Sequence, residues 1–482
     1  MFRRPLALAT WLAPLLSSSL AIAQTATVAP PSATRPDAPI GKTTEDLEAK
    51  LASMQQGGGL TADQAAQRAM MTSVEVAGKR RSIAVASAQG HAMNAQFIPK
   101  LDLSARYTRL SNIHPADVRL LGMTIPGDAL FPIVLNNYQL AAALSIPLSD
   151  YVLRLSNSMA AASHNETAAR LDEQATRLAV ARDARVAYYQ WIRAQDASYV
   201  AAQALEAARG HAFDAKNAFN AGLVSRADLL RAESQVSSAQ LTVARYDSAI
   251  AVATEQLRVA IGDGPNTSYE VGENILVELP AFPVPLTPDA GYAEAFEHRL
   301  EVKQLGESEA SLRNEARVAR AGNLPRLDAQ AEAIYANPNS RYIPPSATWH
   351  GTWNASLILS WTPSNIFGSQ ANAHIAEAHA EEVAWKRAAL KNALRLEVNQ
   401  AMNALTEARV SLTSAREGLL AAEENYRVRR ELYRAGKATA VEVTDAETDL
   451  TRSRLEVVNS HVDERVARVA LIHALGRDRL KQ

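Results

Sequence analysis

Two spacings of apolar residues alternate along the chain, and each predicts a different kind of element. The first is a seven-residue repeat, which is clearest at Leu229, Val236, Val243, Ile250 and Leu257. A second row follows three positions later, at Ala232, Ala239, Tyr246, Ala253 and Ala260. An apolar seam that alternates steps of three and four residues is typical of a coiled coil. Residues 229–260 are therefore predicted to form a helix packed lengthwise against another helix.

The same seam occurs 214 residues later, at Val443, Leu450, Val457, Glu464 and Leu471. Its companion row is Ala446, Ser453, Ser460, Ala467 and Ala474. Glu464 interrupts this second seam, and the sequence alone gives no reason for it.

Longer helices are predicted before both seams. One apolar row consists of Val398, Leu405, Leu412, Leu419, Tyr426 and Tyr433. The alanine rows are Ala401, Ala408, Ala415 and Ala422, and earlier Ala187, Ala194, Ala201, Ala208 and Ala215. Alanine at every seventh position lets helix backbones approach closely, and a strict seven-residue repeat imposes a left-handed supercoil. Residues 157–220 alone would span roughly 100 Å at 1.5 Å per residue.

The chain is an internal duplication. The turns Phe219–Gly222 and Tyr433–Gly436 end in glycines 214 residues apart, as do the later motifs that end in Gly262 and Gly476. The motif Pro99–Asp102 recurs at an offset of 226, so the first copy carries additional loop residues between its strands. The predicted units are a first repeat over 61–262, a connector over 263–288, a second repeat over 289–476 and a short tail over 477–482.

The second spacing is a two-residue alternation, which predicts two strands in each repeat, at about 97–110, 134–147, 325–336 and 349–362. Segments of about ten residues with one apolar and one polar face are what a water-filled membrane barrel needs. Four strands cannot close such a barrel, since even small ones need about eight. Open strand edges in lipid would leave backbone groups unpaired. The hypothesis is therefore a barrel that closes only when several copies of the chain assemble.

Aromatic residues in and around these strands are candidates for contact with outer-membrane lipid. They are Trp349, Trp353, Trp361, Tyr107, Tyr138 and Tyr335. Trp349 and Trp361 are twelve residues apart, which at ~3.3 Å per residue and ~40° tilt places them roughly 30 Å apart along the membrane normal. This separation suits two aromatic girdles on either side of the hydrocarbon layer.

The N-terminal region predicts export. Residues 1–23 form a signal peptide by physical criteria: Arg3 and Arg4, an apolar middle, and the small-x-small site Ala21–Ala23. No later run reaches ~20 apolar residues, so no transmembrane helix is expected. Residues 24–60, rich in Pro, Ala, Thr and Gly, are predicted to be a flexible leader. The chain contains no cysteine, so disulfides, thiolate chemistry and an N-terminal lipid anchor are not expected.

Composition and motifs argue against several function classes. The balance of 50 Lys+Arg against 51 Asp+Glu indicates no nucleic-acid surface. His374 and His379 are five residues apart, the wrong spacing for zinc on one helix face. We find no nucleophile elbow, carboxylate pair or P-loop, so no enzyme, metal or other cofactor is expected. The alternative is a periplasmic coiled-coil scaffold or adaptor protein without a pore, which leaves the tryptophan-bearing strands and the duplication unexplained.

From about Leu60 to Gly476 the chain resembles the TolC-like outer-membrane efflux proteins. The aromatic-x-x-Gly turns and the acid- and alanine-bearing helices that follow them, Asp228–Ala232 and Glu442–Ala446, carry the resemblance. It implies a mainly α fold with a small transmembrane β part. A homotrimer would combine four strands per chain into a 12-stranded β-barrel joined to a long coiled-coil α-barrel.

The resemblance implies a passive exit duct in the cell outer membrane, with its helical part in the periplasm. The implied systems are tripartite efflux and type I secretion. The implied partners are a periplasmic adaptor protein and an inner-membrane pump of the RND or ABC type. The exported substrate and the individual pump stay open.

The resemblance also implies gate residues at the periplasmic tip. Asp228 and Tyr433 match an acid and a tyrosine that form a hydrogen bond in the closed tunnel of the family, and Glu442 and Asp445 match the constricting acids, which share one helix face. A second link is missing because Ala227 and Ala438 occupy its positions, so the strength of the latch stays open. The residues expected to contact adaptor hairpins are Gly222, Leu223, Val224, Ser225, Gly436, Lys437, Ala438 and Thr439.

Overall fold

The computed structural model describes residues 58–113, 116–120, 122–127 and 133–478. The predicted signal peptide, the predicted leader up to residue 57 and the last four residues lie outside these ranges.

The two repeats contain the same elements in the same order. The first repeat consists of α2 (Ala62–Thr72), α3 (Val74–Ala95), β1 (Lys100–Arg109), β4 (Asn136–Ile146), α6 (Ser156–Asn220) and α7 (Arg226–Ile261). The second consists of α8 (Pro288–His298), α9 (Leu300–Ala321), β5 (Arg326–Asn337), β6 (His350–Ser360), α10 (Asn365–Arg434) and α11 (Ala440–Ala474). The predicted duplication of helix, two strands and two helices is confirmed, and each repeat also begins with a short helix.

Additional short elements lie within the first repeat. The hairpin β2 (Val118–Leu120) and β3 (Met123–Ile125) lies in the loop between β1 and β4, where the sequence indicated extra residues. The short helix α5 (Leu148–Asp150) and the π-helical turn η1 (Tyr151–Leu155) lead from β4 into α6. The sequence pattern did not predict these elements.

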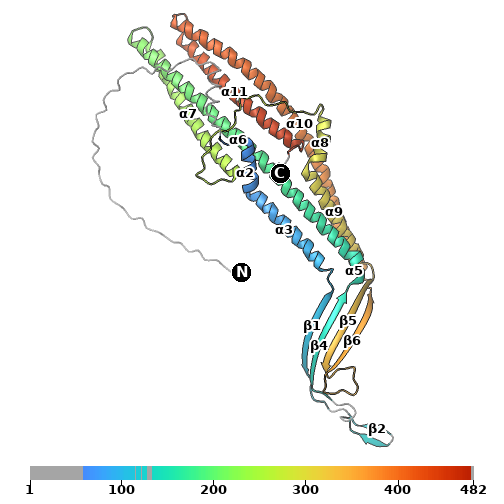
Figure 1. Cartoon of the computed structure of the whole chain (residues 1–482). Helices are drawn as coiled ribbons and strands as arrows, with labels where there is room; N and C mark the ends of the chain where they lie inside the picture. Colours follow the sequence, from blue (N-terminus) through green and yellow to red (C-terminus); the bar gives the residue numbers. More distant parts are fainter. Residues whose placement is uncertain (1–57, 114–115, 121, 128–132, 479–482) are drawn as a thin grey trace, which may run out of the picture. The chain divides into compact units, whose positions relative to one another are not determined.

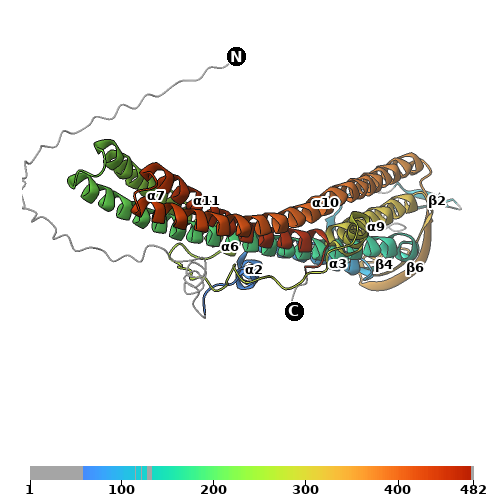
Figure 2. The same cartoon turned by 90° about the horizontal axis from the view of Figure 1, so that it is seen from above.

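The long helices pack side by side in two overlapping sets (Figures 1 and 2). Toward the sheet, α3 packs on α6, α6 on α9, and α9 on α10, which is the order of the strands that these helices adjoin. Toward the other end, α7 packs on α6, α6 on α11, and α11 on α10. The lengths of α6 and α10, 65 and 70 residues, let each helix belong to both sets.

The predicted coiled-coil seams form the core between α10 and α11. Leu405 and Leu471 are buried in one cluster, and Leu419, Val443 and Leu450 in the next. Most helical stability in proteins comes from packing of such apolar stripes rather than from intrinsic propensity. Glu464, which interrupts the seam, forms an ion pair with Arg409 of α10 at 3.6 Å. The interruption is therefore a charged contact between the two helices.

Glycine ends the long helix of each repeat. Gly222 and Gly436 have φ of 75° and 73°, a left-handed conformation that other residues adopt at a cost. The next residue, Leu223 or Lys437, donates its N–H to a carbonyl of the last helical turn. Ser225 and Thr439 then cap the following helices with their side chains. Each turn therefore reverses the chain within a few residues.

The end of the predicted leader pairs with the connector. Leu60 is buried and forms a parallel bridge with Val271; its N–H donates to Glu270, and its carbonyl accepts from the N–H of Gly272 and the hydroxyl of Tyr188. A Cβ on Gly272 would lie 2.1 Å from the Gly59 oxygen. This approach of two backbones requires glycine.

Gly272→Ala is therefore expected to lower the thermal unfolding temperature of the purified protein, since the bridge must open and its buried hydrogen bonds contribute ~1 kcal/mol each. Gly264→Ala in the same connector is the matched control, because no atom lies within 4 Å of its added Cβ. Equal unfolding temperatures for the two variants would contradict the close approach.

The four-stranded sheet has one apolar and one polar face. Its order is β1-β4-β5-β6, and every neighbouring pair is antiparallel. The register aligns Leu103, Ala142, Ala333 and Trp353 on one face. It aligns Asp102, Ala143, Glu332 and Asn354 on the other. The predicted two-faced strands are confirmed as one sheet.

The apolar face lies uncovered by the rest of the described chain. Trp353, Leu357 and Leu103 are 75%, 70% and 74% exposed. A contiguous exposed apolar surface of this kind marks a site of contact with membrane or protein. None of the described helices combines the length and the apolar character needed to cross a membrane.

Candidate functional site

The first predicted gate residue, Asp228, caps a helix in the single chain. Its carboxylate accepts hydrogen bonds from the backbone N–H and the hydroxyl of Ser225, at 3.2 and 2.7 Å. The Asp228 N–H in turn donates to the Ser225 hydroxyl, completing a capping box. These hydrogen bonds to Ser225 lower the pKa of Asp228 below its usual value. The carboxylate is therefore ionised and held at the start of α7.

The other predicted gate residues lie at the equivalent tip. Glu442 forms the matching capping box with Thr439 and an ion pair with Arg429 at 3.6 Å. Asp445 is exposed, one turn further along the same helix. Tyr433 packs against the apolar cluster between α10 and α11. The structure thus places the three acids in the first turns of α7 and α11.

The predicted adaptor-contact residues form the turn between α6 and α7 and the turn between α10 and α11. Leu223 is 79% exposed, and Lys437 and Ala438 occupy the corresponding turn of the second repeat. Gly222 and Gly436 set the turn geometry, and Ser225 and Thr439 cap the next helices. The turns therefore combine a fixed backbone with accessible side chains.

Sequence reasoning missed a buried polar cluster near this tip. His211 of α6 contacts the hydroxyl of Tyr426 on α10 and a carboxylate oxygen of Glu447 on α11, each at 3.2 Å from Nε2. Burial raises the pKa of Glu447 to about 7. Burial also lowers the pKa of His211. Burial therefore shifts both groups toward their neutral forms.

A ladder of polar pairs continues from this cluster between α10 and α11. Its rungs are Glu423–Arg454 at 3.7 Å, Arg416–His461 at 3.4 Å and Arg409–Glu464 at 3.6 Å. Burial, followed by the charges of Arg416 and Arg465, lowers the pKa of His461 to about 4, so the ring is neutral and accepts from Arg416. Successive rungs are seven residues apart on α10. This heptad spacing of polar residues was the sequence signal for the ladder.

Four of the six predicted girdle aromatics cluster near one end of the sheet. Ring centroids are 5.1 Å apart for Tyr107 and Tyr138, 6.1 Å for Tyr138 and Trp349, and 4.9 Å for Tyr335 and Trp349. Trp361 lies at the end of β6 next to the helices, where its indole N–H donates to the carbonyl of Asn323. Trp353 lies between these positions on the apolar face. Tryptophan and tyrosine prefer membrane interfaces because one end is apolar and the other polar.

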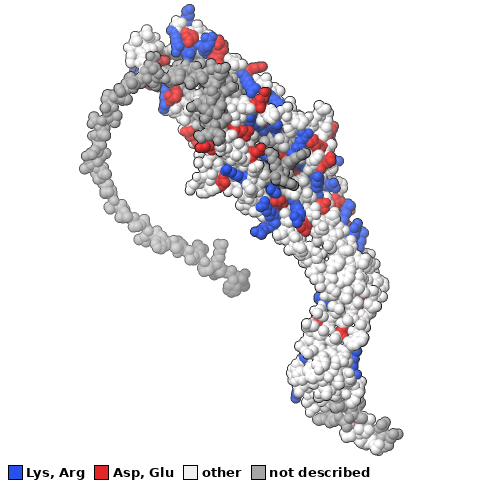
Figure 3. All heavy atoms as spheres, viewed as in Figure 1, with Lys and Arg blue, Asp and Glu red and all other residues white. Residues whose placement is uncertain are grey.

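Charged side chains are distributed unequally between the helices and the sheet. In Figure 3, basic and acidic side chains gather over the helices, whereas the surface over the strands is mostly uncharged. The polar face of the sheet carries a few charged side chains, among them Asp102, Arg326 and Glu332.

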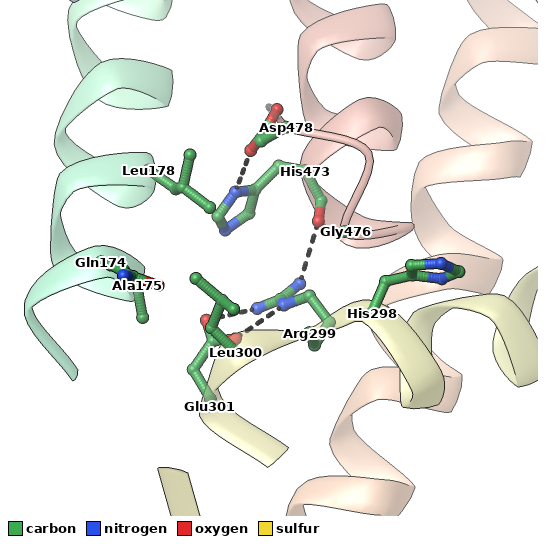
Figure 4. Close-up of a pocket in the computed structure, with 10 residues that line it drawn as sticks. All are labelled: Gln174, Ala175, Leu178, His298, Arg299, Leu300, Glu301, His473, Gly476 and Asp478. Atoms are coloured by element: carbon green, nitrogen blue, oxygen red, sulfur yellow. Dashed lines mark hydrogen bonds and ion pairs between the residues drawn. The ribbon is translucent and has the colours of Figure 1, made fainter. Parts of the chain in front are cut away.

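A small cavity lies where α6, the α8–α9 junction and the end of α11 meet (Figure 4). Its volume is about 210 Å³, and the polar residues Arg299 and His473 in its lining are paired. Arg299 donates to both carboxylate oxygens of Glu301, to Glu397 and to the carbonyl of His473. His473 is paired with Asp478 at 2.7 Å. These contacts join the α8–α9 junction to α10 and to the end of α11, all within the second repeat and the tail. The described residues contain no group of three or more His, Cys, Asp or Glu side chains suited to a metal ion.

Comparison with known proteins identifies the family to which the chain belongs. A family model described as outer membrane efflux protein matches residues 65–263 and 291–477. The chain belongs to this family. The two matched ranges correspond to the two repeats, and the unmatched stretch between them contains the connector. Outer membrane efflux proteins are channels rather than enzymes, and this protein is an outer-membrane channel component of an efflux system.

Solved structures of outer-membrane channels share the fold. The CmeC outer membrane channel of Campylobacter jejuni has a TM-score of 0.71 at 17% identity, with 87% of this chain and 88% of that chain covered. VceC of Vibrio cholerae has a TM-score of 0.69 at 16% identity, covering 89% and 96%.

The open state of the MtrE outer membrane channel of Neisseria gonorrhoeae has a TM-score of 0.70 at 16% identity, covering 86% and 88%. A sequence search of curated proteins found no match.

Proposed function

We propose that three copies of this outer membrane efflux protein form one passive exit duct, with a 12-stranded barrel in the outer membrane and a helical tunnel in the periplasm. The observation that carries the proposal is the single sheet with an exposed apolar face. Within the described residues, β1 and β6 each pair with only one other strand of this sheet. Because β6 runs antiparallel to β1, the β6 edge of one copy can pair with β1 of the next in the same antiparallel sense.

The helices support the same closure. The edge helices toward the turns are α7 and α10, and each exposes apolar side chains opposite its seam. On α7 these are Leu230, Leu241, Val252 and Val259; on the part of α10 that packs beside α11 they are Val410 and Leu420. A second copy that covers both stripes would bury them, and a ring of three copies would leave no edge exposed. This heterologous contact closes when the rotation between copies is one third of a turn.

The proposed duct uses the partners and the route that the family resemblance implies. A signal peptide at 1–23 would direct export, and no lipid anchor would be needed because the barrel itself contacts lipid. A periplasmic adaptor would dock at the turns around Leu223 and Lys437 and connect the duct to an inner-membrane pump of the RND or ABC type. The pump would supply the energy for tripartite efflux or type I secretion, since the sequence contains no P-loop for a nucleotide.

The proposed gate lies where three copies bring their tips together. Glu442 and Asp445 from each copy would place six carboxylates around the pore, a ring that attracts cations and repels itself. Asp228 and Tyr433 are proposed to form the link that holds the tips closed. In the single chain the Asp228 carboxylate already has Ser225 as its partner, so the link to Tyr433 would share this acceptor.

Asp228→Ala combined with Tyr433→Phe is expected to raise the single-channel conductance of the purified protein in planar bilayers, because the closed state loses its link. Glu233→Ala, which removes an exposed acid from the same helix, is expected to leave conductance unchanged. Equal conductance and equal open lifetimes for the double variant and the native protein would count against this gate.

A further inference from the structure

The buried cluster of His211, Tyr426 and Glu447 joins the two helical hairpins of the chain. His211 belongs to the hairpin of α6 and α7, and the other two residues belong to the hairpin of α10 and α11. One ring nitrogen, Nε2, lies 3.2 Å from both the Tyr426 hydroxyl and Glu447 Oε2. Because this nitrogen carries either a proton or a lone pair, it forms a full hydrogen bond with one partner at a time. The contact exists only while three helices stay together.

A buried polar cluster stabilises a helix interface less than apolar residues would. Glu447 and Tyr426 are 7% and 8% exposed, and their neighbours Val443, Ala446 and Leu450 belong to the apolar cluster of the seam. Removing a carboxyl from water carries a penalty that well-packed apolar residues at the same place would avoid. Helices that only needed to adhere would be more stable with apolar residues here.

Burial shifts the cluster toward its neutral forms. It is the main cause that lowers the pKa of His211, and the charges of Arg430 and Arg434 on α10 add to it. Arg430 also lies over the Tyr426 ring, 5.9 Å from its centroid. Asp214 on α6 opposes this lowering of the His211 pKa. On α11 the pKa of Glu447 is raised by burial. When the carboxyl is protonated and the imidazole is neutral, one proton lies between Glu447 and His211, and this link separates without leaving two opposite charges in the interior.

The duplication shows that the cluster is not a by-product of the repeat. The residue 214 positions before Glu447 is Glu233, which is exposed on α7. The residue equivalent to Tyr426 is Ala212. The buried tyrosine–carboxyl pair thus occurs in the second repeat alone, at the interface where α6 meets α11.

We propose that His211, Tyr426 and Glu447 form a latch between the two hairpins, which must part for the tip of the duct to open. The inference rests on the proposed gated duct and adds a link on the inner side of the turns, separate from Asp228 and Tyr433. Opening would separate α6 from the α10–α11 hairpin and expose the three side chains to water.

The latch can be weakened with small changes. Tyr426→Phe removes the hydroxyl and keeps the ring, and Glu447→Leu replaces the carboxyl by an apolar group of similar size. In planar bilayers, the double variant is expected to show at least a tenfold higher ratio of open to closed time than the native trimer. Glu456→Leu makes the same replacement at an exposed position of α11 and is expected to match the native protein.

The latch can also be locked, because the chain contains no cysteine. A cleavable bifunctional thiol reagent that joins His211→Cys to Glu447→Cys is expected to hold the channel at its closed conductance until the reagent is cleaved. A joined pair that still opens would overturn the latch, and so would a trimeric double variant with the native open fraction. If the native protein forms no channel at all, the proposed duct fails, whereas native channels with unaffected variants refute the latch alone.

Discussion

Leu357→Arg is expected to prevent the protein from assembling in the outer membrane, whereas Ser356→Arg is expected to be tolerated. The two residues are neighbours on β6, and the strand alternation places them on opposite faces of the sheet. Leu357 lies on the apolar face and is 70% exposed. Ser356 lies on the polar face, next to Asn354, which donates to Glu332.

The expected loss of assembly follows from the free-energy cost of placing a charge in lipid. An arginine on the lipid face of a barrel costs ~2–4 kcal/mol near the midplane and little near the interfaces. In a trimer this cost would occur three times. The measurement is the amount of protein in the outer-membrane fraction, together with heat-modifiable migration on gels. Equal assembly of both variants would mean that the apolar face does not meet lipid.

Leu241→Glu combined with Val252→Glu is expected to abolish trimer formation and leave the single chain helical. Both side chains lie on the face of α7 that turns away from the seam with α6, and they are 53% and 59% exposed. In the proposed trimer this stripe is covered by α10 of the next copy. Burying each apolar side chain contributes ~1.5–3 kcal/mol, and a buried unpaired carboxylate costs more than this gain.

Gln240→Glu is the control for an added carboxylate, since it introduces one at an exposed neighbouring position of α7 outside the stripe. Analytical ultracentrifugation in detergent gives the subunit number, and circular dichroism gives the helix content. A double-glutamate variant that remains a trimer would exclude this stripe from the interface.

The sequence was sufficient for the parts of the fold that follow local periodicity. Heptad rows located the long helices, and the observed α6, Ser156–Asn220, begins within one residue of the predicted span. Two-residue alternation located the four strands of the sheet and their faces. Glycines at the turns gave the points of reversal, because glycine readily adopts the left-handed conformation that commonly ends a helix.

Contacts between elements far apart in the chain could not be predicted in this way. Glu464 interrupted a seam without a visible reason, because its partner Arg409 lies on another helix. The same holds for His211, whose partners are more than two hundred residues away. A heptad row of charged residues shows that a polar contact exists, but only the packing of three helices shows which residues meet.

The candidate gate illustrates the same limit. The positions of Asp228, Tyr433, Glu442 and Asp445 at the tips follow from the duplicated turns and from the family resemblance. In the single chain the hydrogen bonds of Asp228 and Glu442 are local caps, because Ser225 and Thr439 lie three residues away and occupy these carboxylates. The proposed gate would therefore depend on contacts that form when the tips of three copies meet.

The central claim is that the sheet of one copy continues into the sheet of the next, and crosslinking between strand edges tests it most directly. The register sets Leu103 of β1 in line with Trp353 of β6, three strand spacings or ~14 Å away in one copy. Leu103→Cys and Ala355→Cys, in this cysteine-free chain, would lie at least that far apart in one copy, because Ala355 is two residues further along β6. A thiol reagent with a reach of about half that distance therefore joins them only across a boundary between copies. The account predicts covalent dimers and trimers and no larger species. A folded, membrane-inserted protein that yields only monomers would contradict it.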